Sequence, residues 1–182
     1  MKTLRNTTVA LMLWACTTVL HAVAVLVPAG SGTINTAYAS NPAADTLLLS
    51  GKYTLTANLD ITRPLAILGS GSDTIVLQGG SLRPTGSDIS VSFGGICFEG
   101  GGRAVYLSNG SAAGITMQVD NCVFRGQKRA IYILNADAAL SQLRITNSSF
   151  IDCGDADNRT VYCTNSAGAL ADVDILMDHC TF

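Results

Sequence analysis

Three arginines recur at nearly regular intervals in the second half of the chain. Arg103, Arg129 and Arg159 each begin a short run of mainly apolar residues. Guanidinium groups repeated along one surface can bind carboxylates through paired hydrogen bonds, so this stripe could hold an acidic glycan. The commoner role of such residues is a solvated ladder paired with neighbouring aspartates, and both interpretations stay open.

Two aspartates occupy equivalent positions of a repeated sequence. Asp120 and Asp178 are separated by Thr146 at the intervening position. If successive repeats stack as strands do, about 4.8 Å apart, the two carboxylates lie about 10 Å apart. That separation is near the upper limit for the two acids of an inverting glycoside hydrolase. Aspartates at surface turns are commoner, so a structural role is the alternative.

A third cluster lies in one inserted segment. Asp152, Asp155 and Asp157 are close in sequence, and carboxylate oxygens at such spacing can bind calcium. A polar loop without a metal is the simpler alternative.

Cys153 and Cys163 bracket the insertion, and a disulfide bond between them would close it.

Phenylalanines mark the repeat that positions these groups. Phe98, Phe124 and Phe150 lie 26 residues apart, and Phe182 follows after one longer repeat. A fixed internal period of this length predicts a solenoid whose repeats bury their apolar faces against one another. We expect the phenylalanines to stack as a ladder in the core rather than to form a platform for sugars.

The pattern inside each repeat is that of β-strands. Apolar and polar residues alternate over 117–120 and over 143–146, which is the two-residue period of a strand. The alternation shifts by one residue at Asn121, Asn147 and His179, which predicts a bend that lets both flanking strands face inward. Short strands separated by bends predict an all-β fold, a right-handed parallel β-helix with coils of about 26 residues.

Three asparagines follow the arginines at a constant offset. Asn109, Asn135 and Asn165 are predicted to point inward at the end of a strand. There the side-chain amides can hydrogen-bond the turn backbone and one another. We expect this asparagine ladder to be structural.

The segment 44–80 is predicted to form the opening coils. Its sequence, ADTLLLSGKYTLTANLDITRPLAILGSGSDTIVLQGG, consists of short β-rich runs cut by Gly, Asn and Pro. It resembles the first coils of right-handed parallel β-helix proteins of the pectin-lyase-like superfamily. The later segments VDNCVF, ITNSSF and MDHCTF resemble repeats of the surface-protein branch of that superfamily, which includes autotransporter-like members.

The resemblance implies a fold more strongly than an activity, because this superfamily holds lyases, hydrolases, adhesins and tail spikes. Its lyases use carboxylate-bound calcium with a basic residue, and its hydrolases use clustered aspartates. Neither motif can be carried over to this sequence. We therefore expect a structural, adhesive or glycan-binding solenoid that needs no cofactor, with calcium as an option. The alternative is a polysaccharide lyase or glycoside hydrolase that acts on acidic polysaccharide.

The start of the chain is typical of exported proteins. Lys2 and Arg5 precede an apolar stretch over 9–27, which predicts a secretory signal peptide and a secreted or cell-surface location. Cleavage is expected after Ala39, with Ala24 as the second option, and an uncleaved membrane anchor remains an alternative.

The domain organisation follows from these patterns. Residues 1–39 are assigned to the leader or anchor with a short linker, and residues 40–182 to the β-helix. Within the β-helix, 40–90 are the opening coils and 91–182 the regular repeats. The last repeat is incomplete, so we expect a longer protein in which a missing C-terminal part could hold an anchor or further residues of a site.

Composition limits the partners. The formal net charge is -2 and only 13% of residues are charged, and no basic patch is evident. Nucleic acid is therefore excluded as an expected partner. A glycan or a surface protein remains, with membrane contact only through a terminal segment.

Overall fold

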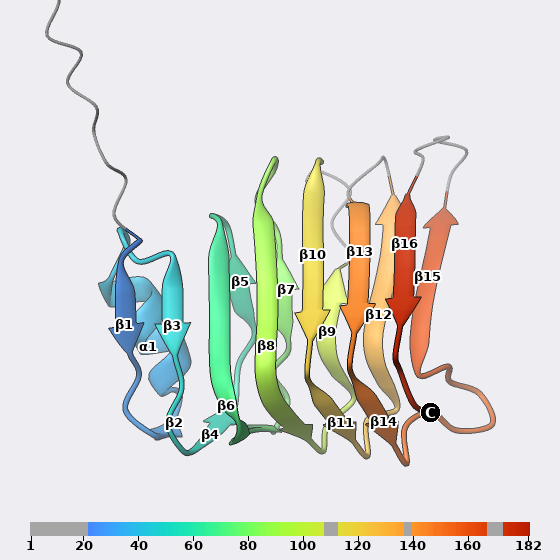
Figure 1. Ribbon diagram of the computed structural model, residues 1–182, viewed down its shortest axis with the longest axis horizontal. Coiled ribbons are helices and arrows are strands. Elements are labelled where there is room, and N and C mark those ends of the chain that lie inside the picture. The colour runs from blue at the N-terminus through green and yellow to red at the C-terminus, as the bar shows by residue number, and fades with distance from the viewer. Residues whose placement is uncertain (1–21, 108–112, 137–139, 167–172) are drawn as a thin grey trace, which may run out of the picture.

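The chain folds into a parallel β-solenoid of about five turns, with coils about 26 residues apart (Figure 1). The structure, a computed structural model, describes residues 22–107, 113–136, 140–166 and 173–182. The predicted all-β solenoid and its period are confirmed. Within these ranges no helix is long and apolar enough to cross a membrane, and the predicted leader lies largely outside them.

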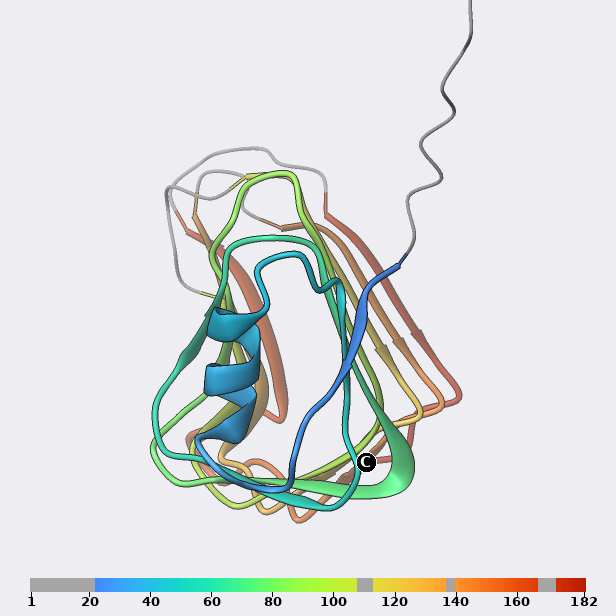
Figure 2. The ribbon, with the colours of Figure 1, turned by 90° about the vertical axis from the view of Figure 1, so that its left-hand side faces the viewer.

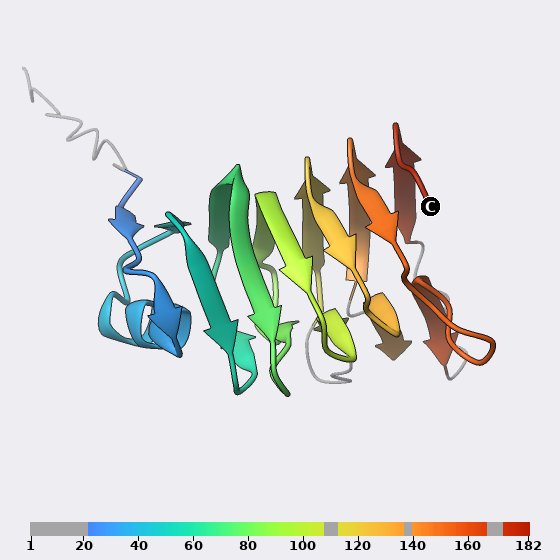
Figure 3. The same cartoon turned by 90° about the horizontal axis from the view of Figure 1, so that it is seen from below.

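The solenoid has two opposite walls, seen from the front in Figure 1 and from below in Figure 3. The front sheet follows the order β1-β3-β6-β8-β10-β13-β16, and the back sheet the order β5-β7-β9-β12-β15. The front-sheet strands are β1 (Ala24–Leu26), β3 (Thr46–Leu48), β6 (Leu65–Leu77), β8 (Ser90–Glu99), β10 (Ile115–Asp120), β13 (Leu140–Thr146) and β16 (Asp174–Asp178). The back-sheet strands are β5 (Leu59–Ile61), β7 (Leu82–Pro84), β9 (Arg103–Leu107), β12 (Arg129–Ala136) and β15 (Val161–Ser166).

A third, narrower face joins the two walls beyond a bend. It contains the distal halves of the long strands β6 and β8 together with four short strands. These are β2 (Gly30–Ser31), β4 (Lys52–Leu55), β11 (Val123–Arg125) and β14 (Ser149–Ile151). Every strand pair of the described chain is parallel, so equivalent side chains of successive coils lie in rows along the axis.

The core is built from these rows. Val105 of β9 pairs with Ile131 of β12, and Met117 of β10 pairs with Leu143 of β13. All four side chains are buried. Residues at alternate positions point outward, as the two-residue period requires.

The four phenylalanines form one stack, in which Phe98, Phe124 and Phe150 are buried in this core and Phe182 is 72% exposed. The ring centroids of Phe98 and Phe124 are 4.9 Å apart, those of Phe124 and Phe150 4.8 Å, and those of Phe150 and Phe182 4.9 Å. The spacing equals that of neighbouring strands, because each ring comes from the same position of its coil. Phe124 has no exposed surface, so its ring contributes to stability and is not accessible to a ligand.

The predicted bends are confirmed. Asn121, Asn147 and His179 each adopt φ 51°, a left-handed conformation that Asn tolerates better than most residues. An earlier coil turns at Gly95, which has φ 64°. A Cβ atom at Gly95 would lie only 2.4 Å from the carbonyl oxygen of Gly69. Only glycine fits that corner.

A helix that was not predicted from the sequence lies at the N-terminal end of the solenoid. Helix α1 (Thr33–Ser40) lies on the back-sheet side of the first coil, next to β5 (Figure 2). It buries Ile34, Ala37 and Tyr38 against the core. The predicted boundary between residues 39 and 40 therefore falls inside α1. Strand β1 lies further upstream and is also part of the packed structure.

Candidate functional site

Three tyrosines form an outward stack on the back sheet. Tyr106 of β9, Tyr132 of β12 and Tyr162 of β15 are paired in register. Their ring centroids are 5.6 Å and 5.2 Å apart. Tyr106 lies between the buried Val105 and Leu107 in sequence, so its side chain faces the opposite way, toward solvent. The tyrosines are half-buried, and part of each ring reaches the surface.

Two of the predicted arginines stack on these rings. The Cζ atom of Arg103 lies 4.3 Å from the centroid of Tyr106 and 4.8 Å from that of Tyr132, and the Cζ of Arg129 lies 4.4 Å from the centroid of Tyr132. All three distances are typical of cation–π contacts. We name Arg103, Arg129 and the three tyrosines the Arg–Tyr ladder.

The arginines of the ladder have no carboxylate partner in the part of the chain that the structure describes. Among the described residues, none of Arg103, Arg129 and Arg159 lies within ion-pair distance of an acid. Arg159 is exposed and precedes β15, so it stands beside the ladder rather than in it. The expected ladder of arginines paired with aspartates is thus not what the described residues form. The guanidinium N–H groups remain available for an anion.

The ladder ends in a neutralised pair. Arg83 of β7 has its Cζ 5.9 Å from the centroid of Tyr106. Its Nε lies 3.2 Å from Oδ1 of Asp60 on β5. The unpaired positive charge is therefore concentrated over β9 and β12. The tyrosine stack was missed in the sequence, although a tyrosine follows each recurring arginine three residues later.

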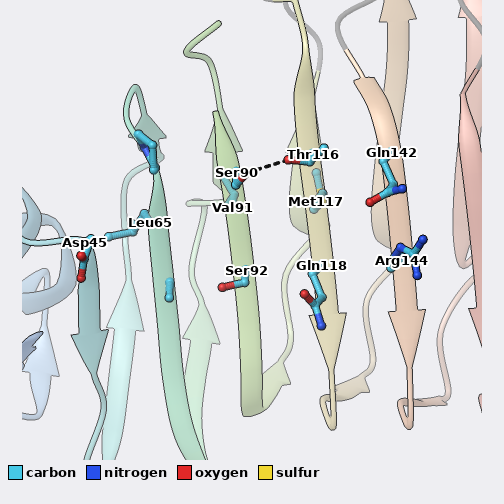
Figure 4. Close-up of a pocket in the computed structure, with 12 residues that line it drawn as sticks. Asp45, Leu65, Ser90, Val91, Ser92, Thr116, Met117, Gln118, Gln142 and Arg144 are labelled. Carbon is cyan, nitrogen blue, oxygen red and sulfur yellow. Dashed lines mark hydrogen bonds between the residues drawn. The ribbon is translucent and has the colours of Figure 1, made fainter. Parts of the chain in front are cut away.

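A second outward feature lies on the front sheet. It is a groove of about 400 Å³ across β6, β8, β10 and β13 (Figure 4). Its polar side chains on the last three strands define the polar groove: Ser90, Ser92, Thr116, Gln118, Gln142 and Arg144. This groove could not be predicted from the sequence, because its residues occupy ordinary outward positions of strands and only the shape of the sheet makes the surface concave.

Only some of the polar groups in the polar groove form hydrogen bonds with other described residues. The hydroxyls of Ser90 and Thr116 are 2.8 Å apart, and Gln142 donates from Nε2 to Asp174 at 3.0 Å. Arg144 lies 3.8 Å from the same Asp174 carboxylate. Within the described part of the chain, the side-chain amide of Gln118 makes no hydrogen bond, and the hydroxyl of Ser92 makes none either.

The predicted carboxylate pair is placed at the bend. Asp120, Thr146 and Asp178 are aligned in register on successive coils. Oδ1 of Asp120 accepts hydrogen bonds from Thr146 at 2.6 Å and from Asn147 at 2.9 Å. These bonds, that of Thr146 first, hold the pKa of Asp120 below its ordinary value. A general acid needs the opposite shift. The carboxylate of Asp178 pairs with its neighbour His179 at 3.0 Å.

In the predicted calcium loop, the carboxylate of Asp155 forms hydrogen bonds within the loop itself. Asp155 accepts hydrogen bonds from Nδ2 of Asn158 at 2.6 Å and from the backbone N–H of Asp157 at 2.9 Å. These bonds lower the pKa of Asp155 and close the turn. Asp152 takes the left-handed conformation, φ 52°. In the described ranges no three acidic, histidine or cysteine side chains gather around a point that could hold a metal. The described residues of this loop thus gather no set of calcium ligands, and the calcium hypothesis stays a prediction.

The predicted disulfide bond is absent as well. Cys153 and Cys163 are both free thiols. Sγ of Cys153 contacts Oε1 of Gln127 at 3.3 Å and the carbonyl oxygen of Phe124 at 3.4 Å. Burial raises the pKa of both thiols. Each cysteine thus packs as a small side chain at the edge of the core, and the turn is held by Asp155 instead.

The asparagine ladder is only partly covered by the structure. The backbones of Asn135 and Asn165 are paired in register between β12 and β15, as expected for residues of one row. Asn109 lies outside the described residues.

Comparison of the chain with models of protein families, with curated proteins and with solved structures finds no match. The function must therefore be inferred from the chemistry of the two outward faces.

Proposed function

We propose that this chain is an exported β-solenoid of the pectin-lyase-like kind that binds an acidic glycan on its back sheet, in a secreted or cell-surface, adhesive role. The observation that carries the proposal is the Arg–Tyr ladder. Arg103 and Arg129 present guanidinium groups that have no acid partner among the described residues, on a chain whose net charge is negative. A local cationic stripe of this kind suits a carboxylate-bearing ligand.

The ladder is preorganised for such a ligand. Arginine side chains normally lose rotamer entropy when they bind, and stacking on Tyr106 and Tyr132 restricts both guanidinium groups in advance. A guanidinium can donate two parallel hydrogen bonds to one carboxylate. Since Arg103 and Arg129 are paired in register on adjacent strands, they repeat at about 4.8 Å. That is close to the length of one sugar unit in an extended polymer.

The tyrosines offer a ligand their ring edges and phenol groups rather than their ring faces. Because Tyr132 is stacked between Tyr106 and Tyr162, its ring faces are covered, and the phenol group points outward. A phenol hydroxyl both donates and accepts hydrogen bonds, as sugar hydroxyls do. The ladder thus offers a row of cationic groups beside a row of neutral polar groups, both running along the solenoid axis.

Catalysis has less support than binding. The pKa of Asp120 is lowered by its hydrogen bonds, and the Asp178 carboxylate pairs with His179. A lyase or hydrolase would need a base or acid next to the cationic groups. Asp120 and Asp178 belong to the front sheet, whereas Arg103 and Arg129 belong to the back sheet.

Affinity electrophoresis of the purified protein in gels that contain polygalacturonate tests the proposal. Replacing both Arg103 and Arg129 by Gln should weaken binding at least tenfold, because both charge-assisted contacts are lost. The matched control is Arg125→Gln, since Arg125 lies on the third face beside Glu99. Equal retardation of the double variant and the wild type would refute the proposal. The appearance of unsaturated uronates or new reducing ends would instead establish a lyase or hydrolase.

Export itself makes a separate prediction about processing. Cleavage after Ala39 would remove β1, β2 and nearly all of α1, and with them the buried residues Val27, Ile34 and Tyr38. Cleavage near Ala24 removes far less of the packed structure. We therefore expect N-terminal sequencing of the exported protein to begin close to residue 25. A mature chain that begins at residue 40 and still unfolds cooperatively would contradict this expectation.

A further inference from the structure

We propose that the polar groove on the front sheet is a second binding site, for a neutral extended glycan, so that one molecule can bridge two different polymers. This proposal does not depend on what the back sheet binds. It rests on the groove's shape, on its mixture of hydrogen-bonding groups, and on its charge.

The groove offers two short rows of polar side chains, of which all but Arg144 can both donate and accept hydrogen bonds. Ser90, Thr116 and Gln142 form one row in register, and Ser92, Gln118 and Arg144 form the other. Successive members of a row lie about 4.8 Å apart. Hydroxyl and amide groups match sugar hydroxyls, which likewise donate and accept.

The charge of the groove favours a neutral ligand. Arg144 is the only cation among its lining residues, and its guanidinium lies 3.8 Å from the carboxylate of Asp174. Asp45 adds a negative charge at the opposite end. An acidic polymer would meet a carboxylate at each end of the groove, whereas a neutral one would meet no net repulsion.

A protein partner fits the groove less well than a glycan. Protein interfaces are enriched in aromatic side chains, and no aromatic residue lines this groove. A peptide strand that extends a sheet needs unpaired backbone groups. The backbones of β8, β10 and β13 are paired on both sides. The groups that remain free are side chains, and they face a cavity of about 400 Å³, within the size range of small-ligand sites.

The two sites are on separate walls. The polar groove belongs to the front sheet and the Arg–Tyr ladder to the back sheet (Figures 1 and 3). The core rows lie between them, so a polymer on one wall leaves the other wall open. A solenoid with this arrangement can cross-link an acidic and a neutral polysaccharide.

The test is affinity electrophoresis of the full chain in gels that contain a soluble, uncharged mixed-linkage β-glucan. The variant replaces both Gln118 and Gln142 by Ala, and the matched control is Gln78→Ala, since Gln78 is exposed outside the groove. We expect the glucan to retard the wild type and the control equally, and the double variant at least tenfold less. The double variant should still bind polygalacturonate as the wild type does.

Three results would overturn the proposal: no retardation of the wild type by the glucan, equal retardation of the double variant, or an equal loss of both glycans in the double variant. If the double variant does not fold, Ser92→Gln serves in its place. This change fills the groove from a solvent-facing position and should weaken glucan binding by a similar factor. Undiminished binding by a folded Ser92→Gln protein would equally overturn the proposal.

Discussion

The same repeat builds two aromatic ladders with opposite roles. Phe98, Phe124 and Phe150 stack inside the solenoid at 4.8 to 4.9 Å, whereas the tyrosines of the Arg–Tyr ladder stack outside it at 5.2 to 5.6 Å. Phe124 has no exposed surface, and Tyr132 is only half-buried. The parity of a position along its strand decides whether a repeated aromatic residue contributes to folding or is available to a ligand.

The largest effect should come from the inner ladder. Phe124→Ala removes a buried ring between two others, which is expected to lower the free energy of unfolding by about 3 to 5 kcal/mol. Urea denaturation followed by circular dichroism measures this loss. The protein that remains folded should bind polygalacturonate with unchanged affinity. A loss below about 1 kcal/mol would contradict the buried stack.

Tyr132→Ala sharpens the comparison, because it removes the equivalent ring from the outer ladder. Two stacking contacts are lost at a half-exposed site, so we expect about 1 to 3 kcal/mol less stability. Arg103 and Arg129 also lose the ring that positions them. The same variant should therefore bind the acidic glycan several-fold more weakly in affinity electrophoresis. If Phe124→Ala and Tyr132→Ala affected stability equally and neither affected binding, the distinction between the ladders would be lost.

Arg129→Ala separates binding from stability on the outer ladder. An exposed cation–π contact is worth about 0.5 to 1 kcal/mol, so the free energy of unfolding should fall by no more than that. Binding of polygalacturonate should fall much further, because a guanidinium is lost from the site. Thermal unfolding and affinity electrophoresis of one preparation give both values. A stability loss as large as that of Phe124→Ala would show that Arg129 is a core residue instead.

The smallest effect on stability is expected from protonation of Asp120 at low pH. Folding lowers the pKa of Asp120, so its hydrogen bonds favour the folded state at pH values above the unfolded pKa of about 4. This contribution is lost as the pH falls through the lower pKa of the folded state. Asp120→Asn should therefore reduce the steepness of acid unfolding below pH 4, followed by fluorescence. The Phe stack contains no group that titrates there, so Phe124→Ala should leave that steepness unchanged.

The solenoid could be predicted because its determinants are local and periodic. The spacing of Phe98, Phe124 and Phe150 defines the coil, and the one-residue shift at Asn121 and Asn147 defines the bend, which the structure confirms at φ 51°. Both features follow from strand parity and turn chemistry, which single residues reveal.

The site could be predicted only in part, because it depends on side-chain partners. The arginine repeat was visible, but its support by Tyr106 and Tyr132 required knowing that both point to the same side of one sheet. The calcium and disulfide hypotheses lacked the same information about side-chain partners. Proximity in sequence did not show that Asp155 bonds within its own turn or that Cys153 faces Gln127. Helix α1 was missed because it lies outside the repeats.

One measurement addresses the contrast between the ladders directly. The protein is prepared with ring-labelled phenylalanine and tyrosine, and its aromatic NMR signals are followed during titration with oligogalacturonate. We predict that the signals of Tyr106, Tyr132 and Tyr162 shift and saturate, while those of Phe98, Phe124 and Phe150 stay in place. Tyrosine signals that do not move at saturating oligosaccharide, or phenylalanine signals that move as far, would contradict the account.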